Sequence, residues 1–157
     1  MIDNTITGIR KMTNALMSSV LDDFGVGAAL NDYVQDLQRS TVVVVINFSD
    51  STLGKDTRVN KNQQVNLFRI AQELINNTIK HGKANKIQLT LSEFEDFVSL
   101  YYFDDGGGFD LYNVKMGSGI TNIRERVEIF NGTIEIETTR GNTIFEIELP
   151  IKPDSDD

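Results

Sequence analysis

The sequence predicts an α+β fold: a two-layer sandwich in which about three helices cover one face of a mixed sheet of about five strands. Segments 87–103 and 134–149 each alternate apolar and polar residues in the manner of a β-hairpin. Segment 66–81 repeats apolar residues at the spacing of an amphipathic helix. Because the strands alternate, one face of the sheet should meet the helices and the other should meet solvent.

Composition fits one globular domain and argues against several function classes. The chain has 157 residues, of which 39% are hydrophobic and 24% charged, enough to bury a core. It has no cysteine and one histidine, which excludes disulfides and thiolate metal sites and fits a cytoplasmic location. The net charge is −8 and no apolar run approaches the roughly 18 residues that span a bilayer. We therefore expect no nucleic-acid binding and no direct membrane contact.

The first third of the chain contains five expected elements. A helix is expected over Ile6–Met17, a connector over Ser18–Gly25 and a short helix over Ala28–Leu37. The β-branched run Thr41–Phe48 suits a central strand, and the polar stretch Ser49–Asn60 is expected to be a loop.

The predicted helix Asn66–His81 has two distinct faces. Its apolar stripe should pack on the sheet and comprises Leu67, Ile70, Ala71, Leu74, Ile75 and Thr78. At about 100° per residue, a second arc beside the stripe carries Glu73, Asn77, Lys80 and His81. This arc offers a carboxylate, a carboxamide and two basic groups, although a solvated helix face is the alternative interpretation.

Two hairpins follow the helix. In the first, the strand around Ile87–Leu91 returns as Phe97–Phe103 after a turn near Glu95 and Asp96. In the second, the strands around Ile134 and Phe145 are joined by a turn at Arg140, Gly141 and Asn142. Pro150 and an acidic tail close the domain.

A glycine-rich loop, DDGGGFD, begins at Asp104 directly after the strand Phe97–Phe103. A carboxylate at a strand end can accept a hydrogen bond from an exocyclic amine, and glycines let a flat base approach the backbone. This is the predicted nucleotide site; a simple turn between strands is the alternative.

A second glycine-containing segment, GSGITNIRERV, begins at Gly117 and leads into an amphipathic helix. The unpaired amides and the positive dipole end of such a helix suit phosphates, but a helix that merely follows two glycines is common. No Gly-Lys-Ser/Thr or strand-linked Gly-x-Gly-x-x-Gly motif occurs, which argues against a P-loop or Rossmann site.

In this order and spacing, the three segments resemble the Bergerat-type ATP-binding fold of sensor histidine kinases, gyrase-type ATPases, Hsp90-type chaperones and mismatch-repair ATPases. The asparagine box would run from Glu73 to His81, and DDGGGFD and GSGITNIRERV would be the glycine boxes. The chain is most similar to histidine kinases of the nitrate-sensor and lipid-sensor class, on the ending IRERV and the connector-like stretch Val20–Leu30.

This resemblance implies ATP and Mg2+ as cofactors and a role for each matched residue. Asp104 would receive the adenine amino group, with Gly106 and Gly108 shaping the base pocket. Asn77 would coordinate Mg2+, while Lys80 and His81 would meet phosphate. Gly117 and Gly119 would form a lid over the phosphates. The expected ATP-binding set is completed by Ser118, Ile120 and Thr143.

Two points of chemistry stay open. The position of Glu73 matches a residue that activates water in gyrase-like relatives, whereas histidine kinases use an imidazole from another domain, so Glu73 is either a base or an orienting group. The single histidine of the chain lies inside the asparagine box, so the phosphoacceptor histidine is expected elsewhere in a longer parent protein.

We therefore expect residues 1–24 to end a dimerisation helix and its connector, residues 25–151 to form the catalytic ATP-binding domain, and residues 152–157 to be an acidic tail. The expected reaction is transfer of the ATP γ-phosphoryl group to a histidine of the parent's dimerisation domain, and then to a response-regulator receiver domain. The parent is expected to be anchored in the inner or plasma membrane of a bacterium. The alternatives are an anti-sigma-type serine kinase and a non-catalytic interaction module with the same fold.

Overall fold

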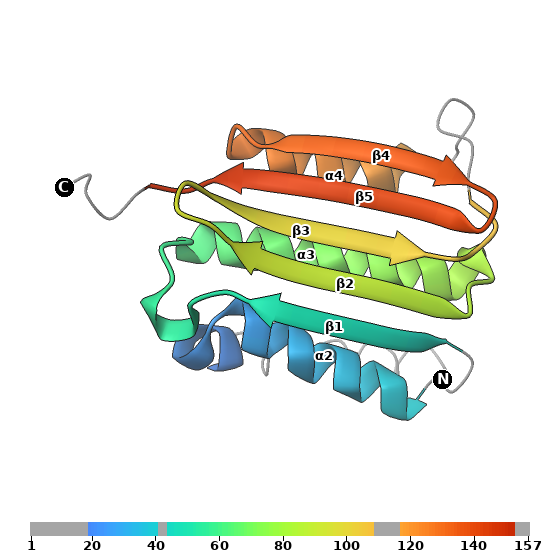
Figure 1. Cartoon of the computed structure of the whole chain (residues 1–157), viewed down its shortest axis with the longest axis horizontal. Helices are drawn as coiled ribbons and strands as arrows, with labels where there is room; N and C mark the ends of the chain where they lie inside the picture. Colours follow the sequence, from blue (N-terminus) through green and yellow to red (C-terminus); the bar gives the residue numbers. More distant parts are fainter. Residues whose placement is uncertain (1–18, 41–43, 109–116, 153–157) are drawn as a thin grey trace.

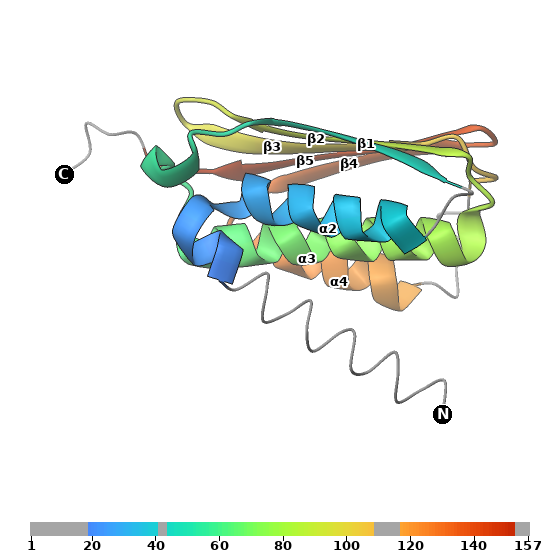
Figure 2. The same cartoon turned by 90° about the horizontal axis from the view of Figure 1, so that it is seen from below.

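The structure is a computed structural model that describes residues 19–40, 44–108 and 117–152. It has two layers, as predicted. Figure 1 shows a five-stranded sheet, and Figure 2 shows helices α2, α3 and α4 on one side of it. The helix expected over Ile6–Met17 and the acidic tail after residue 152 lie outside the described residues.

The sheet has the order β1-β2-β3-β5-β4. β1 pairs with β2 in parallel, and the other three pairings are antiparallel, so the sheet is mixed as expected. Both predicted hairpins are present, β2 with β3 and β4 with β5. The strand bounds are β1 Val45–Ser51, β2 Lys86–Glu93, β3 Phe97–Asp104, β4 Thr133–Thr139 and β5 Asn142–Pro150.

The strand expected over Thr41–Phe48 is not central. β1 lies at the edge of the sheet and has one hydrogen-bonded neighbour, β2. Val45 is 54% exposed and its neighbour Ile46 is 6% exposed, because successive side chains of a strand point to opposite faces of the sheet and the helices cover one face. The strand also continues to Ser51, and the loop expected over Ser49–Asn60 contains the short 3-10 helix η1, Gly54–Asp56.

Helix also occupies part of the segment expected to be a connector. Residues 19–24 are helical, and after a break at Gly25 helix α2 runs over Val26–Ser40, longer than the expected Ala28–Leu37. Gly25 has φ +92°, a left-handed conformation that glycine adopts without steric cost and that ends the first helix. The first amide of α2, at Val26, donates to the buried side-chain oxygen of Gln64 at 3.0 Å.

Helix α3 begins earlier than predicted and does not continue as an α-helix to His81. It runs over Lys61–Asn77, starting at a capping box formed by Asn60 and Gln63. The next five residues, Thr78–Gly82, form the π-helical turn η2. A π-turn pairs residues five apart, so it changes the rotation of every side chain that follows Asn77.

The core lies between the sheet and the helices. The predicted apolar stripe of α3 is buried there, and helix α4, Gly117–Ile129, adds Ile123 and Val127. Along each strand, alternate residues face this layer, including Leu89, Leu100, Tyr102 and Ile147. This packing fixes the polar residues at the end of α3 beside the end of β3. Within the described residues, no helix combines the length and hydropathy that would let it cross a membrane.

Candidate nucleotide-binding site

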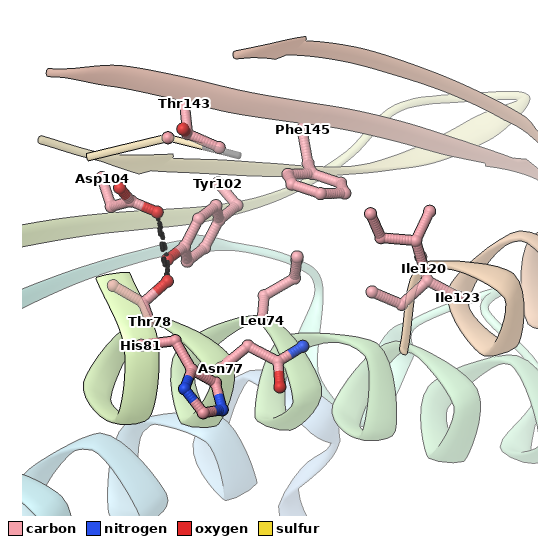
Figure 3. A pocket seen from close by; sticks show the side chains of 11 residues that line it. Leu74, Asn77, Thr78, His81, Tyr102, Asp104, Ile120, Ile123, Thr143 and Phe145 are labelled. Carbon is pink, nitrogen blue, oxygen red and sulfur yellow. Dashed lines mark hydrogen bonds between the residues drawn. The ribbon is translucent and has the colours of Figure 1, made fainter. Parts of the chain in front are cut away.

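A pocket lies between the end of α3, the start of α4 and strands β3 and β5 (Figure 3). All three predicted motifs contribute to it, together with the predicted Thr143. The lining residues are Leu74, Asn77, Thr78, His81, Tyr102, Asp104, Gly108, Ile120, Ile123, Thr143 and Phe145.

Asp104 forms the polar floor of the pocket and is 5% exposed. Its Oδ2 accepts a hydrogen bond from the Tyr102 hydroxyl at 2.8 Å and lies 3.1 Å from the Thr78 hydroxyl, also a donor. Its Oδ1 accepts the Gly106 amide at 2.9 Å. A buried carboxylate is costly unless hydrogen-bonded, and these bonds hold this one in a fixed orientation.

Strand geometry explains why these groups meet. Asp104 ends β3, and Tyr102, two residues earlier, points to the same face of the sheet. Thr143 is the cross-strand partner of Asp104 on β5, is 2% exposed and shares a hydroxyl hydrogen bond of 2.8 Å with Thr138. Burial, and then the negative charge of Asp104, raise the pKa of Tyr102 well above its usual range, so its hydroxyl stays protonated as a donor.

Apolar side chains form the walls. Leu74 from α3 and Phe145 from β5 lie on one side of the Tyr102 ring, and Ile120 and Ile123 from α4 lie beyond them (Figure 3). The Tyr102 and Phe145 rings meet edge to face with centroids 6.0 Å apart. A flat, largely apolar base with one polar edge fits such a space, because the walls replace water while Asp104 satisfies the polar edge.

The first glycine box closes around the floor. The Gly106 carbonyl accepts the Gly141 amide at 2.7 Å, which ties this loop to the β4–β5 turn. Gly108 has φ +75°, and a Cβ there would lie 2.9 Å from the carbonyl oxygen of Thr139. Glycine at position 108 is therefore required both by its backbone conformation and by the close approach of β4.

The asparagine box and the second glycine box touch each other at Gly119. A Cβ at Gly119 would lie 3.0 Å from Glu73 Oε1 and 3.1 Å from Asn77 Nδ2. Asn77 lines the nucleotide pocket, whereas Glu73 lines a neighbouring cavity between α3 and α4 with Arg69 and Arg126. Gly119 is buried and begins the contact of α4 with α3; Gly117 and Ser118 are helical, but their side-chain surroundings lie outside what the structure describes.

The two basic residues of the asparagine box lie differently from one another. Both belong to the π-turn η2, where regular α-helical spacing does not apply. His81 lines the pocket but is exposed, and Lys80 is exposed and is not among the lining residues. Glu73, Asn77 and His81 of the predicted arc therefore face the pocket or the cavity beside it, whereas Lys80 does not line either one.

The donor set fits a magnesium ion held mainly by nucleotide phosphates. In the described residues, no group of three or more His, Cys, Asp or Glu side chains could hold a metal ion. Mg2+ typically keeps water and phosphate ligands and takes one or two oxygens from the protein. Asn77 lines the pocket and carries one side-chain oxygen of this kind.

Sequence reasoning missed part of the site. Thr78 was expected in the apolar stripe, and no role was expected for Tyr102, Leu74, Ile123 or Phe145 at the pocket. The period of two along β3 would have placed Tyr102 beside Asp104. Residues 109–116, between the two glycine boxes, lie outside the described residues.

Comparisons with known proteins agree with the geometry. The family described as "Histidine kinase-, DNA gyrase B-, and HSP90-like ATPase" matches residues 62–153. The histidine-protein kinase/phosphatase DegS of Brevibacillus brevis is 32% identical over 154 residues, covering 96% of this chain and 39% of DegS. The sensor histidine kinase ComP of Bacillus subtilis is 32% identical over 155 residues, covering 94% of this chain and 20% of ComP. The chain thus spans less than half the length of these relatives.

Solved structures show the same fold. A histidine kinase domain from the blue-light activated histidine kinase of Erythrobacter litoralis aligns with a TM-score of 0.67 and 17% identity, covering 80% of this chain and 61% of that chain. The catalytic domain of the histidine kinase ThkA aligns with a TM-score of 0.55 and 19% identity, covering 89% of this chain and 92% of that chain. The chain belongs to the family of histidine kinase-, DNA gyrase B-, and HSP90-like ATPases.

Proposed function

We propose that this domain binds ATP with Mg2+ and transfers the γ-phosphoryl group to a histidine on the dimerisation domain of its parent kinase. The observation that carries the proposal is the buried, hydrogen-bonded Asp104 at the floor of an apolar pocket whose rim includes Asn77. The pairing suits a base at one end and a metal-bound phosphate chain at the other. The single histidine of the chain lies at the pocket rim, which supports an acceptor on another domain.

Each end of the pocket has its own task. Asp104 accepts the exocyclic amine of adenine, Thr143 flanks it, and Gly106 and Gly108 let the base approach the backbone. The apolar walls, including Ile120, exclude water from the base.

At the rim, Asn77 offers an amide oxygen to Mg2+ and His81 offers a ring N–H to phosphate, while the exposed Lys80, outside the lining residues, provides a positive charge. When held there, Mg2+ would supply positive charge to the phosphate chain. The start of α4, with Gly117, Ser118 and Gly119, presents backbone amides to the phosphates. Glu73 orients the Asn77 amide from across Gly119 or serves as a base.

The parent protein would supply the remaining parts. We propose residues 1–24 as the end of a dimerisation helix and connector, 25–151 as the catalytic domain and 152–157 as an acidic tail. The phosphoryl group would pass on to a response-regulator receiver domain, in the cytoplasm of a bacterium whose membrane anchors the parent. The relatives named above are kinases of this signalling type, which favours histidine over a serine of a separate protein and over a non-catalytic module.

The test combines binding and transfer for wild type and Asp104→Asn. Wild type should bind Mg-ATP in calorimetry and move labelled γ-phosphate onto the added dimerisation domain of its parent, as acid-labile label. Asp104→Asn replaces a carboxylate oxygen, which accepts a hydrogen bond from the base, by an NH2 group, which donates one. It should weaken ATP binding by about 100-fold. Equal ATP binding by the variant would contradict the base assignment, and label that is stable to acid would contradict transfer to histidine.

A further inference from the structure

We propose that Tyr102 and Thr78 are positioning residues that occupy one oxygen of Asp104, so that the carboxylate presents a single acceptor and selects a 6-aminopurine over a 6-oxopurine. The inference rests on the proposed nucleotide function of the pocket. It assigns the base selectivity to two hydroxyl groups behind the carboxylate as well as to the carboxylate itself.

The three side chains form a compact hydrogen-bonded group (Figure 3). Tyr102 donates to Asp104 Oδ2 at 2.8 Å, and the Thr78 hydroxyl contacts both that oxygen, at 3.1 Å, and the Tyr102 hydroxyl. Thr78 has one hydroxyl proton, so it donates a hydrogen bond either to Asp104 directly or to Tyr102, which in turn donates a hydrogen bond to Asp104. In the first arrangement both acceptor sites of Oδ2 are used within the protein. In the second, Tyr102 uses one site, and the Thr78 oxygen lies 3.1 Å from Oδ2, so this oxygen still lies against the two hydroxyl groups.

Counting acceptor sites gives the selectivity. A carboxylate has about four lone-pair sites, two on each oxygen. Tyr102 and Thr78 lie against Oδ2, and the Gly106 amide uses one site on Oδ1. The site left on Oδ1 can accept one hydrogen bond from a ligand. The exocyclic amine of adenine donates that hydrogen bond, whereas a 6-oxopurine presents a carbonyl oxygen at the same position, which the carboxylate repels.

Burial stabilises the hydrogen bonds among Tyr102, Thr78 and Asp104. Tyr102 is 1% exposed and Thr78 is 7% exposed, so water does not compete for their hydroxyl groups. Desolvation and the charge of Asp104 both raise the pKa of Tyr102, which keeps the proton on the hydroxyl at physiological pH. A buried hydroxyl group costs free energy unless it is hydrogen-bonded. The Tyr102 hydroxyl therefore keeps its hydrogen bond to Asp104 and orients the carboxylate, which a phenylalanine ring would not do.

The elements that carry the group also fit a positioning role. Asp104 and Tyr102 lie on β3, while Thr78 is the first residue of the π-turn that ends α3. The same turn continues into Lys80 and His81, the basic residues of the phosphate end. The carboxylate is thus held from the sheet and from the helix at once, which fixes its angle toward the pocket.

The test measures the affinities of wild type and Tyr102→Phe for Mg-ATP and Mg-ITP, which carry an amine and a carbonyl at position 6. The ring of the variant still packs on Phe145, so the pocket keeps its shape. ATP binding should weaken by about fivefold to tenfold while ITP binding stays within about twofold. Thr78→Val should shift the ATP to ITP ratio in the same direction by a smaller factor.

Tyr33→Phe is the matched control. Tyr33 is also buried, stacks edge to face on Phe68, and donates its hydroxyl to Asn76 Oδ1 at 2.9 Å, but it does not line the pocket. It should leave the ATP to ITP ratio unchanged. Equal weakening of both nucleotides by Tyr102→Phe, or weakening of neither, would overturn the inference.

Asp104→Asn separates this inference from the proposed function. If the asparagine variant loses ATP affinity and Tyr102→Phe causes no further change of the ATP to ITP ratio in that background, the hydroxyl acts through Asp104. If Asp104→Asn binds ATP as wild type does, the base assignment itself fails. If Asp104→Asn loses ATP while Tyr102→Phe keeps the wild-type ratio, the positioning role alone fails.

Discussion

The two ends of the pocket, which we propose to hold the base and the phosphates, are built in different ways. At the base end, Asp104 and Thr143 are almost fully buried and each has a side-chain hydrogen-bond partner. At the phosphate end, Lys80 and His81 are exposed, and Asn77 is half-buried beside Gly119. The base end is fixed by adjacent strands, whereas the phosphate end is carried by a π-turn and by the first turn of α4.

We propose that this difference separates nucleotide recognition from phosphoryl transfer. A preformed, buried base pocket orders few groups on binding, so changes there should act on nucleotide affinity. Exposed groups at the other end are arranged together with the nucleotide and its metal, so changes there should act more on the rate of transfer. The following predictions test that separation.

The largest effect is expected from Asn77→Ala. The variant loses the amide oxygen proposed for Mg2+, so γ-phosphoryl transfer to the parent's dimerisation domain should fall by about 100-fold. Affinity for ATP without magnesium should change little, because the base end is intact. Initial rates of label transfer and calorimetry with and without Mg2+ provide the measurements.

Asn76→Ala is the control for this variant. Asn76 is the same residue type one position earlier, but its oxygen accepts the Tyr33 hydroxyl between α3 and α2. Transfer by this control should stay within about twofold of wild type, with a loss of about 1 kcal/mol in the free energy of unfolding. A magnesium dependence of ATP binding that survives in Asn77→Ala would contradict the assignment of the ligand and weaken the contrast between the two ends.

Local patterns were enough to predict most of the fold. Both hairpins and the layer order followed from the period of two along the strands and the amphipathic α3. The edge position of β1 was missed because a β-branched run such as 41–48 reports strand propensity, whereas neighbours in the sheet are set by pairing between distant segments. The helix at 19–24 was missed because the resemblance to a connector outweighed the helical spacing of Val20, Leu21 and Phe24.

Residues of the site that belong to one short sequence motif were predicted, whereas contacts between residues far apart in the sequence were not. Asp104, Gly108 and Asn77 belong to short motifs, and all three line the pocket. The hydroxyl groups of Tyr102 and Thr78 meet across 24 residues of sequence, so no motif contains both. The π-turn that carries Lys80 and His81 was not predicted, because a change from α to π pairing leaves no simple trace in residue type; of the two residues, only His81 lines the pocket.

A smaller effect is expected from Gly119→Ala, which tests whether the two motifs must touch at the phosphate end. The new methyl group would lie 3.0 Å from Glu73 and 3.1 Å from Asn77, so both side chains would shift by a few tenths of an ångström. Transfer should fall by about tenfold, since displaced reacting groups lose rate steeply, with a much smaller loss of ATP affinity. Alanine favours helix over glycine, so thermal unfolding should show no loss of stability.

Gly107→Ala serves as the matched control, because a Cβ at that position meets no atom within 4 Å. It should keep wild-type transfer and binding. A Gly119→Ala variant that lost ATP affinity and transfer in equal measure would show that the two ends are not separable by this contact.

The smallest effect is expected from Lys80→Gln, which probes the exposed charge of the phosphate end. Because Lys80 is solvent-exposed, its attraction to phosphate is screened, and its loss should weaken ATP binding by no more than about fivefold at low salt. The difference from wild type should shrink as the salt concentration rises, whereas the effect of Tyr102→Phe should persist because that hydroxyl is buried.

Lys86→Gln, at an exposed lysine that does not line the pocket, is the control for a change in net charge alone. A Lys80 effect that is independent of salt would mean that this lysine is held against the nucleotide as closely as the base is, and the contrast between a fixed base end and an open phosphate end would then fail.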